Sequence, residues 1–204
     1  MNVRKFLNVS GALLFVILLA AFNLLAVEAG AKQNREGRLV RRAEAATGDR
    51  FTFAAETRGG VRVFAVTKPQ PEMLRAIDDG FRDLFVIARR NGYRERLHLT
   101  DYTVFIARPD RTHDRNKAYS PALKIAAQGY TGSQYDQGGY IFVAGMVLTL
   151  DPCSFIVPEH TGEWARVAEV VRYEGEHLVL YHNDRARFDA TMDHSRGGAH
   201  PILR

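Results

Sequence analysis

Residues 163–184, EWARVAEVVRYEGEHLVLYHND, are the stretch that decides the fold of this chain. Apolar residues recur along it at helical spacing, at Trp164, Val167, Ala168, Val171 and Leu178. This spacing predicts a long helix that buries one stripe against a core. A second set lies about 60° further round the same helix and consists of Tyr173, Glu174, His177 and Tyr181. Because these side chains can carry chemistry, the second face is the expected place of a functional site.

The sequence before this helix contains strands that such a stripe would cover. Residues 61–66 alternate on two faces, and residues 102–107 (YTVFIA) are β-branched and aromatic, as strands usually are. Residues 140–150 (YIFVAGMVLTL) form a longer apolar run, which predicts a buried strand that is bent or bulged at Gly145. Weaker strand candidates are residues 51–53 and 122–127.

A second helix is predicted over residues 72–90, where apolar residues form a broad face and Asn91-Gly92 closes the helix. The order of elements is then strand, helix, strand, strand, strand, helix. This order predicts an α+β domain with a single twisted mixed sheet, a supporting helix early in the chain and the long motif-bearing helix late. The strands at residues 102–107 and 140–150 are expected to be neighbours in that sheet.

The first 31 residues have the pattern of a targeting segment. Arg4 and Lys5 precede an apolar run over residues 6–27, and Ala29-Gly30-Ala31 follows as an A-x-A site. This pattern is typical of a secretory signal peptide, and the run is also long enough for an N-terminal membrane anchor. Both alternatives place the rest of the chain outside the cytoplasm, as a secreted, periplasmic or membrane-anchored protein.

The remaining chain is expected to form one domain. Residues 32–50 are charged and alanine-rich, with little that could form a core. They are expected to be a flexible tether or a short solvated helix. The domain is then expected over residues 51–204, a length that suits a single core.

Charge and cysteine content limit the classes of function. The chain has 28 Lys and Arg residues against 23 Asp and Glu residues, a net charge of +5, and the two signs are interspersed. This distribution does not resemble a nucleic-acid-binding stripe. Cys153 is the single cysteine, so an intrachain disulfide is excluded. It is expected to be a small buried residue, because a cysteine nucleophile would need an activating histidine beside it.

The run Tyr173-Glu174-Gly175-Glu176-His177 resembles the HExxH helix of the zincin-like metallopeptidases. In that motif two histidines at i and i+4 bind zinc, and the glutamate after the first histidine deprotonates a metal-bound water. Here Tyr173 replaces the first histidine. The resemblance implies that His177 is a metal ligand and that Glu174 is the catalytic base. It covers this motif and, as an order of elements only, residues 61–184.

The tail DHSRGGAHPILR, residues 193–204, offers further ligands. His194 and His200 flank Ser195-Arg196-Gly197-Gly198, a run that favours a sharp turn. Zincins commonly take a ligand from downstream of the helix, so the resemblance implies a zinc site of His177, His194 and His200. The alternative is a polar C-terminal loop whose imidazoles are solvated.

Three classes of function remain open. The first is an extracytoplasmic zinc metallopeptidase, in which Tyr173 could donate a hydrogen bond to the developing oxyanion. The second is a zincin-like domain that binds metal but has weak or lost activity, because a neutral phenol is a poor zinc ligand. The third is a secreted or membrane-anchored binding or structural module without metal. The second class is our prediction, with a peptide or protein as substrate or ligand.

Overall fold

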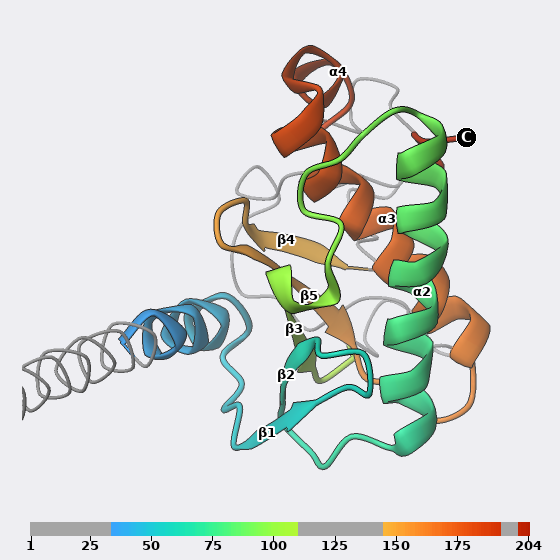
Figure 1. Cartoon of the computed structure of the whole chain (residues 1–204). Coiled ribbons are helices and arrows are strands. Elements are labelled where there is room, and N and C mark those ends of the chain that lie inside the picture. The colour runs from blue at the N-terminus through green and yellow to red at the C-terminus, as the bar shows by residue number, and fades with distance from the viewer. Residues whose placement is uncertain (1–33, 110–144, 193–199) are drawn as a thin grey trace, which may run out of the picture. The chain divides into compact units, whose positions relative to one another are not determined.

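The structure, a computed structural model, describes residues 34–109, 145–192 and 200–204 (Figure 1). The chain divides into two compact units, Met1–Arg41 and Arg42–Arg204, and the sheet belongs to the second. Residues 34–47 are helical. The elements that follow are β1 (Phe53–Glu56), β2 (Arg62–Ala65), α2 (Pro71–Arg90), the 3-10 helix η1 (Leu99–Asp101), β3 (Tyr102–Ala107), β4 (Met146–Thr149), β5 (Cys153–Pro158), α3 (Trp164–Asn183) and α4 (Arg185–Thr191). None of the helices in the described ranges has both the length and the apolar surface needed to cross a lipid bilayer.

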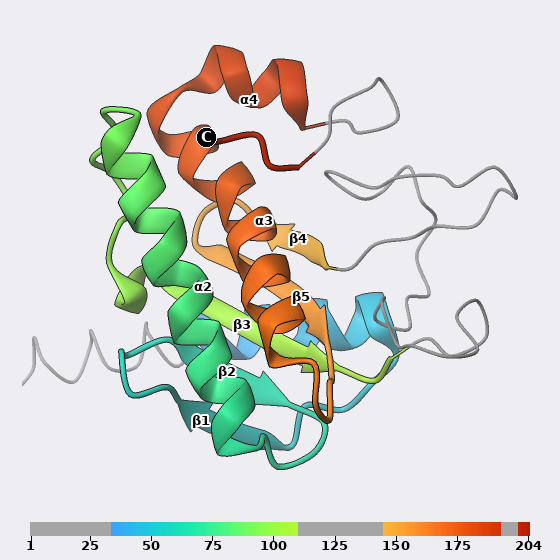
Figure 2. The ribbon, with the colours of Figure 1, turned by 90° about the vertical axis from the view of Figure 1, so that its right-hand side faces the viewer.

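The five strands form one mixed sheet in the order β1-β2-β3-β5-β4 (Figure 2). The strands β2, β3 and β5 are parallel, whereas β1 pairs antiparallel with β2 and β4 pairs antiparallel with β5. All residues of β3 and β5 are buried, as is usual for parallel strands that are covered on both faces. The predicted α+β class with a single mixed sheet is confirmed.

The prediction that residues 102–107 and 140–150 form adjacent strands is wrong, although both segments belong to the sheet. Both segments contribute to the same sheet, but β5 lies between β3 and β4. Only residues 150–152 join β4 to β5, so these two strands pair as a hairpin and β5 is the strand that meets β3. The ladder of this hairpin is irregular between Val147 and Thr149, after the bulge position expected at Gly145. Residues 122–127 and 140–144 lie outside the described residues.

The helix predicted over residues 72–90 is confirmed as α2, which begins one residue earlier. Pro71 occupies its first turn, where a backbone N–H is not needed and the fixed φ of proline suits a helix. Phe81 packs against Tyr102 of β3 and Phe155 of β5, with ring centroids 4.4 and 5.8 Å away. The apolar face of α2 is therefore buried on the sheet.

The motif-bearing helix α3 lies beside α2 on the same face of the sheet (Figures 1 and 2). It occupies Trp164–Asn183, within the stretch 163–184 in which a long helix was predicted. Of the predicted stripe, the buried members are Val167, Val171 and Leu178, and the half-buried members are Trp164 and Ala168. The stripe thus faces the core, and the remaining width of α3 is available for other contacts.

Two glycines let α2 and α3 approach closely. A Cβ on Gly80 of α2 would lie 2.4 Å from the carbonyl oxygen of Ala168. A Cβ on Gly175 of α3 would lie 2.4 Å from Cδ2 of Leu84. Both distances are far shorter than a normal contact: a larger residue at Gly80 would push the helix backbones apart, and one at Gly175 would require the Leu84 side chain to move. This spacing determines how deeply the second face of α3 is buried.

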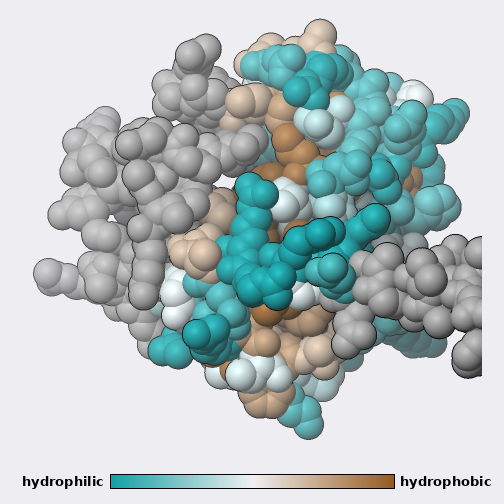
Figure 3. All heavy atoms as spheres, turned by 90° about the vertical axis from the view of Figure 1, so that its left-hand side faces the viewer, coloured by the Kyte–Doolittle hydropathy of each residue, from teal (hydrophilic) through white to brown (hydrophobic). Residues whose placement is uncertain are grey.

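The opposite face of the sheet carries a smaller aromatic cluster. Phe105 lies on this face because successive residues of β3 alternate between faces. It meets Phe51 edge-on at 5.2 Å and stacks with Phe64 of β2 at 5.4 Å. In the view of Figure 3, hydrophobic and hydrophilic residues are interspersed over the described surface. Of the aromatic cluster, Phe51 and Phe105 are buried and Phe64 is half-buried, whereas Phe53 of β1, outside the cluster, is 42% exposed.

Candidate functional site

Three of the predicted site residues lie within little more than one turn of α3: Tyr173, Glu174 and His177. Glu174 and His177 are both buried, so they are not a solvated surface pair. His200 of the tail lies against the same turn. Its ring stacks on Tyr173 with centroids 4.9 Å apart and meets His177 edge-on, also at 4.9 Å. The structure therefore brings His177 and His200 together, whereas the predicted ligand His194 lies outside the described residues.

The tail is anchored by Glu176, a residue for which the sequence alone suggested no role. Its carboxylate is completely buried and accepts hydrogen bonds from the backbone N–H groups of Ile202, at 2.8 Å, and Leu203, at 3.3 Å. The same carboxylate pairs with Nδ1 of His200 at 2.8 Å. Arg172, one turn earlier on α3, lies 3.8 Å away. A buried charge is tolerated when it is paired and hydrogen-bonded, and the tail supplies most of these partners.

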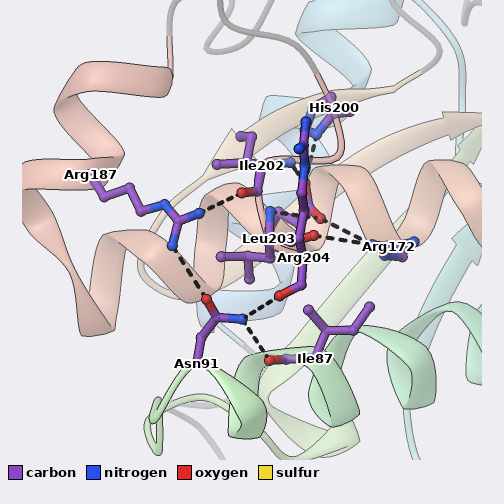
Figure 4. Close-up of polar contacts among 9 residues, drawn as sticks. Ile87, Asn91, Arg172, Arg187, His200, Ile202, Leu203 and Arg204 are labelled. Atoms are coloured by element: carbon purple, nitrogen blue, oxygen red, sulfur yellow. Dashed lines mark hydrogen bonds and ion pairs between the residues drawn. The ribbon is translucent and has the colours of Figure 1, made fainter.

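Three further side chains hold the carbonyl groups of the tail (Figure 4). The side chain of Arg172 donates to the carbonyl oxygen of Leu203 (3.2 Å), that of Arg187 to the carbonyl oxygen of Ile202 (2.6 Å), and that of Asn91 to the carbonyl oxygen of Arg204 (3.1 Å). These donors come from α3, α4 and the end of α2, so the tail contacts three helices. The side chain of His200 is only 17% exposed. In the described part of the tail, therefore, the histidine is docked rather than solvated.

The contact with Glu176 also bears on which nitrogen of the His200 ring carries a hydrogen. A carboxylate can only accept hydrogen bonds, so Nδ1 of His200 must carry the hydrogen. In the neutral imidazole, Nε2 then keeps its lone pair. This is the arrangement found in metal-ligating histidines, whose second nitrogen usually donates to a carboxylate or a carbonyl.

Glu174 has the most perturbed carboxyl group among the described residues of the site. Burial, and after it the nearby negative charge of Glu176, raise the pKa of Glu174 to about 8. The carboxyl also lies against the backbone, since a Cβ on Gly145 would come within 2.6 Å of Cγ and 2.9 Å of Oε1 of Glu174. A carboxyl with this pKa holds its proton at neutral pH and can donate it.

His177 and His200 fit part of a zinc site. Neutral imidazoles are common zinc ligands, and a catalytic zinc site has three protein ligands with one open position. Across residues 34–109, 145–192 and 200–204, no group of three or more His, Cys, Asp or Glu side chains is placed to hold a metal ion. The two imidazoles would therefore need a third donor, and His194 in the same tail is the residue predicted for that role.

Cys153 has a histidine beside it but is not an activated nucleophile. Its Sγ lies 3.6 Å from Nε2 of His182, and the same Nε2 lies 3.0 Å from the carbonyl oxygen of Leu150. Because a carbonyl oxygen only accepts, Nε2 carries a hydrogen and cannot take the proton of the thiol. Burial raises the pKa of Cys153 to about 12. The prediction of a small buried residue is confirmed.

Comparisons with protein-family models, curated proteins and solved structures gave no match to this chain. A fold of this class alone does not establish a chemistry, since one architecture serves many functions. The function is therefore inferred from the side chains that α3 and the tail bring together.

Proposed function

We propose that this domain is a zincin-like, extracytoplasmic metal-binding domain that holds zinc through His177 and His200, with His194 as third ligand. The observation that carries the proposal is the contact between His177 and a tail histidine whose Nδ1 is backed by a buried carboxylate. Such a carboxylate fixes the tautomer and the ring orientation of a metal ligand. The position of His177 in the motif that resembles HExxH adds to this support.

We further propose that peptide hydrolysis by this domain is weak or lost. Zinc at such a site supplies an activated water and polarises a carbonyl group. The base in that chemistry would be Glu174, yet its pKa of about 8 leaves it protonated at neutral pH unless a nearby positive charge lowers that pKa. Tyr173 occupies the place of the first motif histidine, and its ring packs on His200. Both features favour metal binding over efficient catalysis.

Metal analysis of the purified protein tests the metal proposal. About one equivalent of zinc is expected in the wild type, and His177→Ala and His200→Ala should lose it. His98→Ala is the matched control, because His98 is exposed and lies on the loop before β3. A full equivalent retained in both site variants would place the metal elsewhere.

Assays on a broad peptide library test the catalytic part. The variants to compare with the wild type are Glu174→Gln, which removes the acid or base, and Tyr173→His, which restores the motif. Cleavage that appears only in Tyr173→His would support a lapsed peptidase. Strong cleavage by the wild type that Glu174→Gln abolishes would refute the proposal of weak or lost activity.

The second candidate is a binding or structural module without metal, secreted or anchored at a membrane, with a peptide or protein ligand. One observation favours it: Glu176, Arg172 and Arg187 dock the tail by hydrogen bonds and ion pairing, and Glu176 orients His200 in the same way. In that case zinc should leave the melting temperature unchanged. A zinc-dependent rise in melting temperature that is absent from His200→Ala would contradict this candidate, because a ligand that binds the folded state stabilises it.

A further inference from the structure

Both oxygens of the Glu176 carboxylate are engaged by donors from the tail. Oε2 lies 2.8 Å from Nδ1 of His200 and 2.8 Å from the backbone nitrogen of Ile202. Oε1 accepts from the N–H of Leu203 at 3.3 Å. The two backbone N–H groups can only donate, so each oxygen of Glu176 already serves as an acceptor. Glu176 therefore acts toward His200 as an acceptor.

The ring of His200 is held on three sides. Glu176 binds it at Nδ1, Tyr173 stacks on its face and His177 meets it edge-on. Since the two nitrogens of an imidazole point in diverging directions, Nε2 is directed away from Glu176. The hydrogen on Nδ1 leaves Nε2 with the lone pair that a metal needs.

We propose that Glu176 is a positioning residue of the metal site: it holds His200 in the Nδ1–H tautomer, so that Nε2 is the ligating atom beside His177. The metal part of this inference rests on the proposed function, whereas the tautomer does not. The same carboxylate binds the backbone of the tail, so docking of the tail and preparation of the ligand occur together. His177 follows Glu176 directly in α3, which ties both histidines to one helical turn.

The chain offers a way to separate ligand orientation from tail docking. Arg187 and Asn91 hold tail carbonyls at Ile202 and Arg204 and make no hydrogen bond to the His200 ring. A variant at Arg187 therefore weakens the tail without removing the acceptor of Nδ1. Glu176→Leu removes that acceptor, and Glu176→Gln keeps one oxygen acceptor at similar size but loses the charge.

The experiment uses the whole protein with Glu176→Leu, Glu176→Gln, Arg187→Leu and the exposed control Glu169→Gln. Side-chain ¹⁵N NMR of the metal-free protein shows which nitrogen of His200 carries the hydrogen. Competition with a chelating dye measures zinc affinity, and thermal unfolding of the metal-free protein measures stability. In the wild type we expect the hydrogen on Nδ1. In Glu176→Leu it should move to Nε2, with a loss of zinc affinity of about 10–100-fold.

The variants should then rank differently in tautomer, in zinc affinity and in melting temperature. Glu176→Gln is expected to keep more of the Nδ1–H tautomer and of the zinc affinity than Glu176→Leu. Arg187→Leu should lower the melting temperature while leaving the tautomer and zinc affinity near those of the wild type. Glu169→Gln should match the wild type throughout.

Two results would overturn the inference. The first is a hydrogen on Nε2 of His200 in the metal-free wild type, a measurement that needs no variant to fold. The second is an equal loss of zinc affinity in Arg187→Leu and Glu176→Leu, which would make tail docking the sole cause. If the wild type binds no zinc but the tautomer shifts as expected, the proposed function fails while the positioning by Glu176 stands.

Discussion

Glu174 lies almost completely inside the protein, where its carboxyl group has lost the water that would stabilise its charge. Its pKa rises from the ordinary 4.5 to about 8. Glu176, two residues along the same helix, is even more buried, and three groups of the tail contact its carboxylate. Two glutamates in one turn thus have different surroundings: within the described ranges, the tail provides hydrogen bonds to Glu176, and no hydrogen bond to the Glu174 carboxyl is found.

The raised pKa of Glu174 predicts a pH dependence of stability. Below about pH 4.5 both the folded and unfolded states hold the proton, and the group has no effect. Between about 4.5 and 8 the unfolded chain releases the proton while the folded chain keeps it. The free energy of unfolding should therefore fall as pH rises through this window, by at most about 1.4 kcal/mol per pH unit.

Urea unfolding of the wild type and Glu174→Gln at several pH values measures this effect. Glutamine cannot ionise, so the stability difference between the two proteins should change with pH across the window and level off above about pH 8. A difference that stays constant with pH would show that Glu174 is not held in its neutral form.

Cys153 gives a second prediction at this scale. Its thiol is buried, its pKa is raised to about 12, and the thiolate is the reactive form. Iodoacetamide should therefore modify the native protein far more slowly than the protein unfolded in urea, as followed by mass spectrometry. Comparable rates in the two states would mean that His182 does activate the thiol.

At the scale of elements, the crossing of α2 and α3 places the site. The two helices are packed so closely that a Cβ on Gly80 would collide with the backbone of α3, and one on Gly175 with the side chain of Leu84. The same packing buries the turn of α3 that carries Glu174, Glu176 and His177. A change in the spacing of the helices would therefore alter both the stability and the burial of the site.

We expect Gly80→Ala to destabilise the domain. The new Cβ would lie 2.4 Å from a backbone oxygen, at Ala168, and 2.9 Å from Cβ of Val171, so the helices must separate. Overpacking of this kind costs about 1–3 kcal/mol, which exceeds the gain in helix propensity of about 1 kcal/mol. Urea unfolding should show the loss.

The matched control is Gly162→Ala, where a Cβ would meet nothing within 4 Å and φ is not in the left-handed region. Its effect on the free energy of unfolding should stay within about 0.5 kcal/mol. If Gly80→Ala proved as stable as this control, the close approach of the helices would not contribute to the fold as described.

At the scale of the whole molecule, the N-terminal pattern predicts where the domain works. Residues 1–31 have the features of a signal peptide or a membrane anchor, and both alternatives place the domain outside the cytoplasm. An alkaline phosphatase reporter fused after Arg204, which is active only outside the cytoplasm, should therefore be active. A reporter that stays inactive in the cytoplasm would contradict the prediction. The mass of the exported protein would distinguish a cleaved N-terminal segment from a retained one.

The sequence by itself determined the two long helices of the domain and the fold class, whereas α4 was not predicted. The predicted bounds of α2 are correct to within one residue, and α3 lies in the stretch where a long helix was predicted, because helical periodicity and end signals are local properties of the chain. The adjacency of Tyr173, Glu174 and His177 was equally local, since one helix carries all three. The strand β5 was missed, because its short apolar run after Pro152 has no alternation to mark it.

Only the tertiary structure decided the strand order and the roles of the two glutamates. The partners of Glu176 lie 24 to 27 positions further along the chain, and no local pattern shows that a tail N–H or imidazole will reach its carboxylate. The raised pKa of Glu174 depends on burial by packing, which periodicity around one helix did not reveal. The docking of His200 beside His177 likewise depends on side chains from α2, α3 and α4 together. Long-range contacts of this kind form only when separate elements meet, so they follow from the packed molecule and not from any one segment.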